Sequence, residues 1–453
     1  MENTKEKFRA IINEAVNNLF AKIAGELMST SFTDIVRFTQ LSVNELGARL
    51  IELIVGIVDD RYNEQRNKHN ITLRHTKTRK MVSSMGELNL KRRLYYDKAA
   101  CRYFFAVDEL LNIEKFSRIE GELKTKLIND ATLTSYGKAS TLSGNCVSRQ
   151  TVHNLVKRVP VASLQAQPSG EFRKVDKIFI EADEDHIHLN NGKSAEVKLV
   201  YVHEGWRKVC HGRTELINAK YFASIQNGDD IWYDVQDYID EQYNQRNTEL
   251  HLSGDGARWI RRGLDIFQNA EYHIDKFHIY KNITEATAGH PQIRRRIIEN
   301  LKIGEQEKVH SLFFQLWNSI NGPKQKLQHL RVSNSMSYID DNFSAIDLKA
   351  VCGCSAEGHI SHVLSDRLSS RPMGWSKPGA EKIAKLRTFH FNGGDFANLR
   401  PLRKENDDVS AKDHKNWPVR EFNTDGSIHQ GQFMGPSSVL EEIKKVLLGV
   451  TEE

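Results

Sequence analysis

The chain has few cysteines, few prolines and no long apolar run. Its 453 residues include 5 cysteines and 9 prolines. The cysteines are odd in number and scattered, which excludes a secreted disulfide framework and favours a reducing compartment. The most apolar run, residues 50–58, contains Glu52 and is too short to span a bilayer. Because the N-terminus also lacks the pattern of a signal peptide, we expect a soluble cytoplasmic protein with no membrane partner.

Neither sign of charge dominates. Lys and Arg number 64 against 59 Asp and Glu, so the formal net charge is +5. This small excess weakly favours an acidic partner such as nucleic acid. With 39 % hydrophobic residues, the chain can build sizeable cores, and at roughly 150 residues per domain its length predicts about three structural units.

The first 160 residues predict three segments. Apolar residues at helical spacing indicate a helical N-terminal domain over residues 1–75. Residues 76–100 change to alternation, with Leu88, Leu90 and Leu94 after a turn at 83–86, and this predicts a basic β-hairpin. Residues 101–160 return to helical character. The charge of Arg92 and Arg93 is explained equally well by a solvated strand face and by phosphate contact, and we take both as candidate DNA contacts.

Two short helices joined by a turn are predicted within residues 135–157. A helix begins near Ser135, residues 143–145 form a turn, and Ser148 is placed to cap a second helix. This pattern fits helix-turn-helix geometry, although any helical hairpin produces it. Together with the capping serine, the candidate DNA contacts on the second helix are Arg149, Gln150 and His153.

After a linker at 161–173, the chain changes to alternating strands and helices. Strands are predicted at 178–183, 195–202, about 216–225, 249–253 and 271–274, with helices at 231–246 and 257–269. The predicted order is three strands, a helix, a strand, a helix and a strand. This is the order of a ribonuclease-H-like fold, a mixed sheet flanked by helices, and it belongs to the α/β or α+β class. We expect residues 174–289 to form the first part of this core, 290–350 a helical insertion, and 351–453 the second part with a C-terminal tail.

Acidic residues stand where strands of this sheet end. Asp183 closes an apolar strand and Asp255 follows another, and ligands bind at that edge of open sheets. Two neighbouring carboxylates repel each other unless a divalent cation lies between them, so we expect Mg²⁺ there. Glu357, at the start of a later helix, is the candidate third acid. A single Asp taken alone is more often a helix cap or an exposed charge.

Several motifs carry a family resemblance. They are IEADEDH at 180–186, SGDGARWI at 253–260, SAEGH at 355–359 and RLSSRPMGW at 367–375. In this order they closely resemble the ISLre family of bacterial insertion-sequence transposases, a group similar to the Mutator-like DDE transposases. The resemblance implies that Asp183, Asp255 and Glu357 are the catalytic, metal-binding triad. It also implies that His278, in Asp275-Lys276-Phe277-His278, matches an Asp-x-x-His motif and contacts the active site or DNA.

Some local assignments have alternatives. Asp185 would lie on the same strand face as Asp183 and is the competing first ligand. Trp375 is either a packing aromatic or a side chain that stacks on a flipped base. Histidines in sequence contexts such as those of His273 and His278 more often make ordinary hydrogen bonds within the protein than act as ligands. His186, His188 and the cysteines lack the paired spacing of a structural zinc site.

The resemblance implies a DDE transposase with two Mg²⁺ ions, for which Mn²⁺ substitutes. Its partners would be double-stranded DNA, both transposon ends and target, and it would act in the cytoplasm on the nucleoid as a homo-oligomer of at least two copies. A ribonuclease-H-like nuclease that hydrolyses without joining is the alternative enzyme. A catalytically silent DNA-binding regulator descended from a transposase is the alternative of another class.

Overall fold

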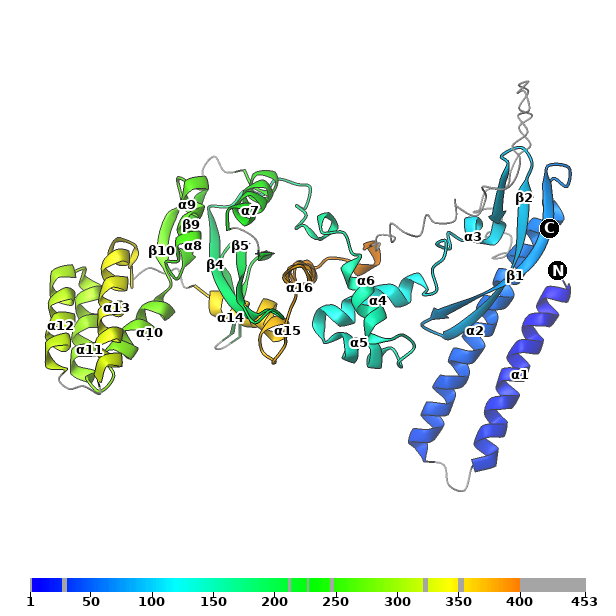
Figure 1. The fold of residues 1–453 in the computed structure, drawn as a ribbon, viewed down its shortest axis with the longest axis horizontal. Coiled ribbons are helices and arrows are strands. Elements are labelled where there is room, and N and C mark those ends of the chain that lie inside the picture. The colour runs from blue at the N-terminus through cyan, green and yellow to red at the C-terminus, as the bar shows by residue number, and fades with distance from the viewer. Residues whose placement is uncertain are drawn as a thin grey trace. The chain divides into compact units, whose positions relative to one another are not determined.

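The computed structural model describes residues 2–26, 31–210, 213–225, 228–244, 248–320, 325–348 and 354–399. These residues form two compact units (Figure 1). The first contains residues up to 128 together with 139–155, and the second contains 129–138 and the residues from 156 onward. Most of the predicted C-terminal tail, from residue 400 on, lies outside the described residues.

The first unit begins with two long helices, α1 (Glu2–Glu26) and α2 (Phe32–Gln65), which pack side by side. A capping box starts α2: the Asp34 amide donates to Ser31 Oγ at 3.2 Å, and the Ser31 amide donates to Asp34 Oδ2 at 3.3 Å. The predicted helical character of the N-terminal segment is confirmed.

Beside α2 lies a three-stranded antiparallel sheet of β1 (Ile71–Ser83), β2 (Gly86–Asp97) and β3 (Arg102–Phe105), followed by α3 (Ala106–Leu110). The turn is at the predicted place, and Gly86 takes the positive φ of +117° that the turn requires. Leu88 and Leu90 pack with Val55 of α2. The predicted hairpin is confirmed, and β3 extends it. The predicted boundary at residues 75 and 76 is wrong, because α2 ends at Gln65 and β1 begins at Ile71.

Three shorter helices follow, α4 (Gly121–Leu133), α5 (Tyr136–Leu142) and α6 (Arg149–Lys157). Between α5 and α6, Gly144 and Asn145 both have positive φ. Ser148 caps α6, because its Oγ accepts from the Thr151 amide at 3.2 Å. The two helices and the turn predicted over 135–157 are therefore present.

A five-stranded mixed sheet is the centre of the second unit. Its strands are β4 (Lys177–His188), β5 (Ser194–His203), β8 (Lys220–Ser224), β9 (Glu249–Gly254) and β10 (Glu271–Ile274). Their order is β10-β9-β4-β5-β8. β4, β9 and β10 are parallel, whereas β5 is antiparallel to both β4 and β8. The predicted strands are present, with the third reduced to β8, and a small hairpin, β6 (Trp206–Cys210) and β7 (Arg213–Leu216), precedes it.

Alternation along β4 separates the two faces of the sheet. Ile178, Ile180 and Ala182 face an apolar core shared with α7 (Gly228–Gln242), α8 (Arg258–Arg261) and α9 (Gly263–Ile266). The single helix predicted at 257–269 is wrong: it is two short helices that meet at Arg262. Gly263 lies so close to Trp232 that a Cβ there would approach the indole to 3.0 Å. Packing against this core therefore determines the backbone path between the two short helices.

Four helices after β10 share a second apolar core in this unit (Figure 1). They are α10 (Lys276–Ala286), α11 (Pro291–Ile303), α12 (Gln306–Ser319) and α13 (Lys326–Asn342). Ile283, Phe313 and Val332 are fully buried where they meet. The helical part predicted at 290–350 therefore begins earlier, at residue 276.

The last described elements are short except for one. They are α14 (Ala356–Ile360), a π-helical turn at Ser361–Ser365, α15 (Asp366–Leu368), α16 (Lys377–Phe391) and a 3₁₀ turn at Phe396–Asn398. α14 packs on β4 and α16 on β8. Among the described residues, none of the helices combines the length and hydrophobicity needed to cross a membrane.

Candidate functional site

Two carboxylates converge where the parallel pairing of β4 with β9 ends. The prediction that Asp183 closes its strand is wrong, because β4 continues to His188 in its pairing with β5. β4 and β9 are paired in register up to Glu181 and Ser253. Asp183 and Asp255 each lie two residues beyond that pair, on the same side of their strands. With His278 they form a cluster in which one potential ligand atom from each residue lies within 4.8 Å of the others.

Glycines on both sides of Asp255 make its position possible. A Cβ at Gly254 would lie 2.8 Å from the Ile260 side chain, and one at Gly256 would lie 2.7 Å from Asn342 Oδ1. Gly256 also has a φ of +96°. The turn directs the carboxylate back onto the chain, where Asp255 Oδ1 accepts from the Ala257 amide at 2.8 Å.

Asp183 is half-buried and has an unusual proton affinity. Burial raises the pKa of its carboxyl to about 6, and the nearby charge of Asp255 acts in the same direction. A hydrogen bond from the Glu184 amide, 2.8 Å from Oδ1, and the neighbouring His278 partly offset this rise. Two carboxylates held together in this way are the arrangement that a divalent cation neutralises.

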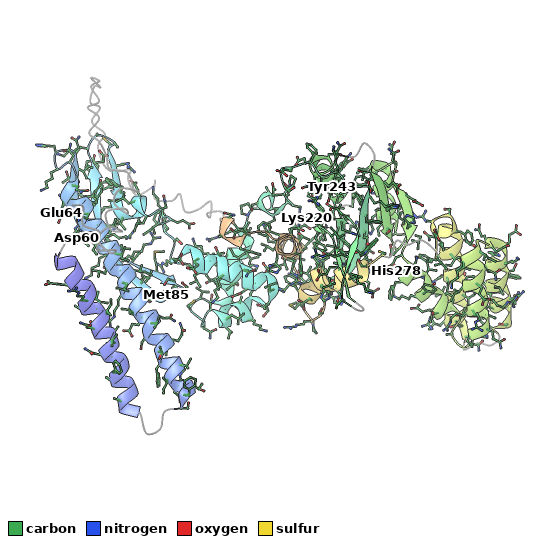
Figure 2. The ribbon with its side chains drawn as sticks, turned by 180° about the vertical axis from the view of Figure 1, so that it is seen from behind. Asp60, Glu64, Met85, Lys220, Tyr243 and His278 are labelled. Carbon is green, nitrogen blue, oxygen red and sulfur yellow. The ribbon has the colours of Figure 1, made fainter. Side chains whose placement is uncertain are left out.

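His278 (labelled in Figure 2) reaches the cluster from the first turn of α10. Asp275 caps this helix, accepting from the Phe277 amide at 2.9 Å, and its other oxygen lies 3.1 Å from His278 Nδ1. Burial opposes protonation of the imidazole, but Asp275 and the cluster carboxylates outweigh it and raise the pKa of His278. The Asp-x-x-His spacing thus places the buried carboxylate of Asp275 next to the imidazole of His278.

The remaining predicted acids lie elsewhere. Asp185 accepts two contacts from Ser369 Oγ, at 3.0 and 2.8 Å, so its carboxylate is occupied within the chain. Glu357 is exposed in the first turn of α14 and is not a member of the Asp183, Asp255 and His278 cluster. The segment just before α14, residues 349–353, lies outside the described residues.

A buried polar network under α14 was not predicted from the sequence. Glu181 is 1 % exposed. Its carboxylate contacts His203 Nε2 at 2.9 Å and accepts from the Ser355 amide at 2.7 Å and from the Tyr201 hydroxyl. Glu181 and Asp183 alternate along β4, which places both on one face. The spacing of two residues between Glu181 and Asp183 is the sequence signal from which a polar face of the sheet, opposite the apolar face, could have been predicted.

Two arginines proposed to contact DNA are engaged within the chain, Arg92 buried and Arg93 partly buried. Arg92 is 7 % exposed, pairs with Asp108 and lies over the Phe105 ring. Arg93 pairs with Asp59 at 2.9 Å and with Asp60, labelled in Figure 2, at 2.8 Å. These guanidinium groups connect the hairpin to its own unit, because alternation turns Arg92 inward with the leucines and α2 carries the acids that face Arg93.

Trp375 is likewise a packing residue, 6 % exposed. Its Nε1 donates to the Leu368 carbonyl at 2.9 Å, and the Arg367 guanidinium lies 4.9 Å from its ring centre. The packing alternative therefore describes it, and its ring is not presented to a base.

On α6, by contrast, Arg149 and Gln150 are exposed. Gln150 Nε2 lies 3.3 Å from His153 Nδ1 and donates to Asn154 Oδ1 at 3.1 Å. The helix therefore presents a hydrogen-bonded polar face, with Ser148 engaged as its cap.

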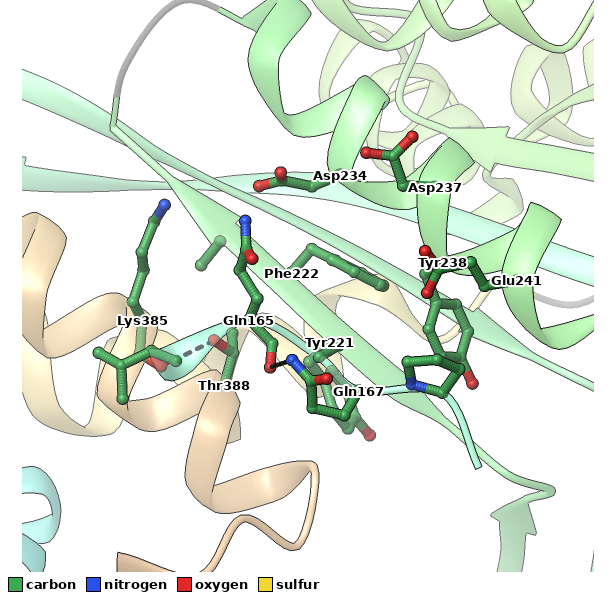
Figure 3. Close-up of a pocket in the computed structure, with 14 residues that line it drawn as sticks. Gln165, Gln167, Tyr221, Phe222, Asp234, Asp237, Tyr238, Glu241, Lys385 and Thr388 are labelled. Atoms are coloured by element: carbon green, nitrogen blue, oxygen red, sulfur yellow. Dashed lines mark hydrogen bonds between the residues drawn. The ribbon is translucent and has the colours of Figure 1, made fainter. Parts of the chain in front are cut away.

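A cavity of about 250 Å³ lies at the opposite edge of the sheet, by β8, α7 and α16. Figure 3 shows Asp234 and Asp237 on one side of it and Lys385 on another. None of its lining residues belongs to the Asp183 cluster. The cavity is therefore separate from the site at the carboxyl ends of the strands.

Comparison with known proteins places the chain in a family. Residues 27–405 match the family described as "Uncharacterised protein family (UPF0236)". A relative from Caldanaerobacter subterraneus subsp. tengcongensis is 34 % identical over 393 residues, covering 85 % of this chain and 83 % of the relative. The chain belongs to the UPF0236 family. The printed name of that UPF0236 relative carries eleven locus designations.

Two further UPF0236 proteins show the span of the likeness. UPF0236 protein TTE2489 of the same organism is 33 % identical over 406 residues, 87 % of this chain and 86 % of the relative. The "UPF0236 protein in vanSb 3'region" of Streptococcus gallolyticus is 26 % identical over 334 residues, 70 % of this chain and 73 % of the relative. The UPF0236 match therefore includes both the hairpin and the carboxylate cluster.

Proposed function

We propose that this UPF0236 chain is a DDE-type transposase that cleaves and joins the DNA ends of a mobile element. The observation that carries the proposal is the convergence of Asp183 and Asp255 from adjacent strands, each two residues beyond the last parallel pair of β4 and β9. Half-burial and the raised pKa of Asp183 favour occupation by a divalent cation over two unpartnered charges.

The strand order supports a ribonuclease-H-like catalytic core. The sheet combines the antiparallel strands β8, β5 and β4 with β9 and β10, which run parallel to β4, in the order β10-β9-β4-β5-β8. Asp183 lies on β4, and Asp255 directly follows β9. The apolar face is covered by α7, and the polar face by α14. In this arrangement Asp183 and Asp255 lie on the side of the sheet at which open sheets bind their ligands.

The residues have separate roles in the proposed reaction. Asp183 and Asp255 would hold Mg²⁺, or Mn²⁺ in its place, which activates a water or a 3′-hydroxyl and stabilises the leaving oxygen when bound. Asp275 orients His278, whose raised pKa favours the cationic form that attracts a phosphate. Glu357 is the proposed third acid. It follows Ser355, which is bonded to Glu181 on the same sheet face as Asp183.

The family comparison adds independent support. One relative carries eleven locus designations from one strain under a single name. Multiple copies of one protein-coding sequence in a genome are the expected result of an element that multiplies. For this chain we therefore propose double-stranded DNA as partner, in the form of element ends and target, with synapsis by at least two copies on the nucleoid.

A cleavage assay tests the proposal. The substrate is labelled DNA carrying the sequences that flank the gene, incubated with Mg²⁺ or Mn²⁺. Asp183→Asn, Asp255→Asn and Glu357→Gln should each abolish nicking while DNA binding persists. Asp237→Asn, an exposed acid at the separate cavity, is the matched control and should cleave normally. Nicking by Asp183→Asn at the wild-type rate would contradict the assignment.

The alternative nuclease function uses the same carboxylates and differs in its product. Supplying a pre-cleaved end with a free 3′-hydroxyl distinguishes the two activities. A transposase joins this end to target DNA, whereas a nuclease yields only hydrolysed strands. Absence of any metal-dependent cleavage with intact DNA binding would instead favour the regulator.

A further inference from the structure

A second group of potential metal ligands lies on β9 and β10, away from the ends that carry Asp183 and Asp255. It consists of His251, Glu271 and His273. His251 pairs with Glu271 across the two parallel strands, and His273 lies two residues further along β10. All three therefore project from one face of the sheet. His251 is four residues before Asp255, which along a strand is about 13 Å.

The three potential ligand atoms are separated as tetrahedral ligands are. His251 Nδ1 lies 3.2 Å from His273 Nε2 and 3.5 Å from Glu271 Oε2, and His273 Nε2 lies 3.6 Å from the same oxygen. Zinc bonds of 2.0–2.2 Å in tetrahedral geometry separate neighbouring ligands by about 3.4 Å. The triangle is thus close to one face of a zinc coordination shell, with a fourth position left for water.

The His251 ring is fixed from both sides. It is 5 % exposed and stacks on the Phe179 ring, whose centre is 5.1 Å away at an angle of 15°. Its Nε2 is buried without a hydrogen-bond partner, and Glu249 Oε2 lies 3.7 Å from it. With Nδ1 as a metal ligand, the proton lies on Nε2 and faces that carboxylate, which is the usual outer support of a zinc-bound histidine.

An ion can reach this group from solvent. β10 is an edge strand of the sheet. The Glu271 side chain is 68 % exposed, whereas the side chains of His251 and His273 are largely buried. The two imidazoles form a buried floor and the carboxylate forms the rim. A hydrogen bond between His251 and His273 accounts for their approach to each other. Glu271 Oε2 lies 3.5 and 3.6 Å from their nitrogens, too far for a good hydrogen bond to either.

We propose that His251, Glu271 and His273 bind one Zn²⁺ ion, which ties the edge strand β10 to β9. Two imidazole nitrogens and one carboxylate oxygen suit zinc better than Mg²⁺, which prefers oxygen ligands. The proposed zinc site is distinct from the cation site of the proposed function and does not depend on it.

The test uses the full-length chain carrying Asp183→Asn and Asp255→Asn, so that the other cluster cannot hold the metal. After removal of metals with a chelator, Co²⁺ is titrated to follow its tetrahedral visible absorption, and Zn²⁺ is then added to displace it. We expect one equivalent of each, and a rise in Tm when Zn²⁺ binds.

His273→Ala should weaken Zn²⁺ binding by roughly 100-fold or more, in line with the losses that follow damage to zinc-ligand shells. Glu271→Gln is the variant that folds in any case, because the side chain is exposed, and it should also weaken binding. His310→Ala, at a half-exposed histidine on α12, is the matched control. It should bind Zn²⁺ with the same affinity as the chain that carries Asp183→Asn and Asp255→Asn alone. No tetrahedral Co²⁺ signal, or equal Zn²⁺ affinity in Glu271→Gln and the background, would overturn the proposal.

Discussion

The buried carboxylate of Asp275 lies 3.1 Å from Nδ1 of His278, one helical turn away on α10. The same carboxylate caps the helix through the Phe277 amide. One acid therefore sets both the start of α10 and the orientation of the imidazole that faces Asp183 and Asp255. Asp275 is a positioning residue for the proposed site, and its effect is measurable without any reaction.

Asp275→Asn should lower the pKa of His278 in the metal-free protein. Asn keeps the helix cap but removes the negative charge that helps hold the pKa of His278 above its usual value of 6.5. Titration of the histidine resonances by NMR measures the change. Asp340→Asn, beside His310 on other helices, is the control and should leave His278 unchanged. A His278 pKa that is the same in Asp275→Asn and wild type would contradict this role.

Asp183→Asn should stabilise the metal-free protein at pH 8. The pKa of Asp183 is about 6 in the folded state against an ordinary 3.8, so the folded state binds the proton more tightly and loses stability as pH rises through about 6. At about 1.4 kcal/mol per pKa unit, the gain on substitution is at most about 3 kcal/mol. It should vanish near pH 3.5.

Urea unfolding at pH 3.5 and pH 8, in the presence of a chelator, measures this gain. Asp237→Asn, at an exposed site, should change stability little at either pH. Added Mg²⁺ should restore the relative stability of the wild type, because only the wild type keeps both carboxylates. A loss of stability in Asp183→Asn at pH 8 would show that the charged carboxylate is well accommodated without a cation.

Glu204 has the opposite pH dependence. Burial alone would raise the pKa of its carboxyl, but hydrogen bonds from Arg173 at 2.6 Å, Asn218 at 2.8 Å and Tyr243, labelled in Figure 2, at 3.2 Å lower it below 4.5. The stabilising contribution is therefore present above about pH 4.5 and is lost as pH falls.

Glu204→Gln should cost about 2 kcal/mol of unfolding free energy at pH 7, the usual size for a hydrogen bond to a charged group. The difference from wild type should shrink toward pH 3. Urea unfolding across this range provides the measurement. Glu215→Gln removes the acid of an exposed ion pair with Arg207 and should cost less than 1 kcal/mol. A cost for Glu204→Gln that is independent of pH would point to packing in place of charge.

The strands of the central sheet could be predicted from the sequence, but the polar groups buried against that sheet could not. Alternation and turns predict each of the five strands. Asp183 and Asp255 are recognisable from their position after apolar runs, although β4 continues beyond Asp183 to His188. The Glu181 network was missed because its partners, His203 and Ser355, come from distant segments that only the folded sheet brings together. The His251 and His273 pair was missed for the same reason, since pairing of β9 with β10 creates it.

The basic hairpin shows how local charge misleads. Its strands are predicted correctly, yet Arg92 is two residues after Leu90, in the series that faces the core. The periodicity that predicts the strand thus already places this side chain inside. What periodicity does not reveal is the acid that makes the position tolerable, because Asp108 comes from a helix after the sheet.

Arg92→Met should therefore destabilise the protein without changing how salt affects DNA binding. Removing Arg92 leaves Asp108 with the longer contact to Arg79, at 3.4 Å, and should cost about 3 kcal/mol or less. Lys91→Ala, at the exposed neighbouring position, should leave stability nearly unchanged and reduce the slope of log affinity against log salt by about 1 if it contacts a phosphate. A slope for Arg92→Met that is reduced relative to wild type would contradict the structural role of Arg92.

Under the proposed function, Arg149 and Gln150 are the side chains of α6 expected to read base edges, because both are exposed on its first turn. Arg149→Ala and Gln150→Ala should weaken binding to the proper DNA end by about 1–3 kcal/mol each, with a smaller effect on random DNA. Lys157→Ala, in the last turn of the same helix, is the comparison variant and should affect both DNAs equally or not at all. Binding curves on both DNAs at one salt concentration measure the ratio. An equal loss on specific and random DNA for Arg149→Ala would assign that residue to the phosphates and leave sequence recognition to another element.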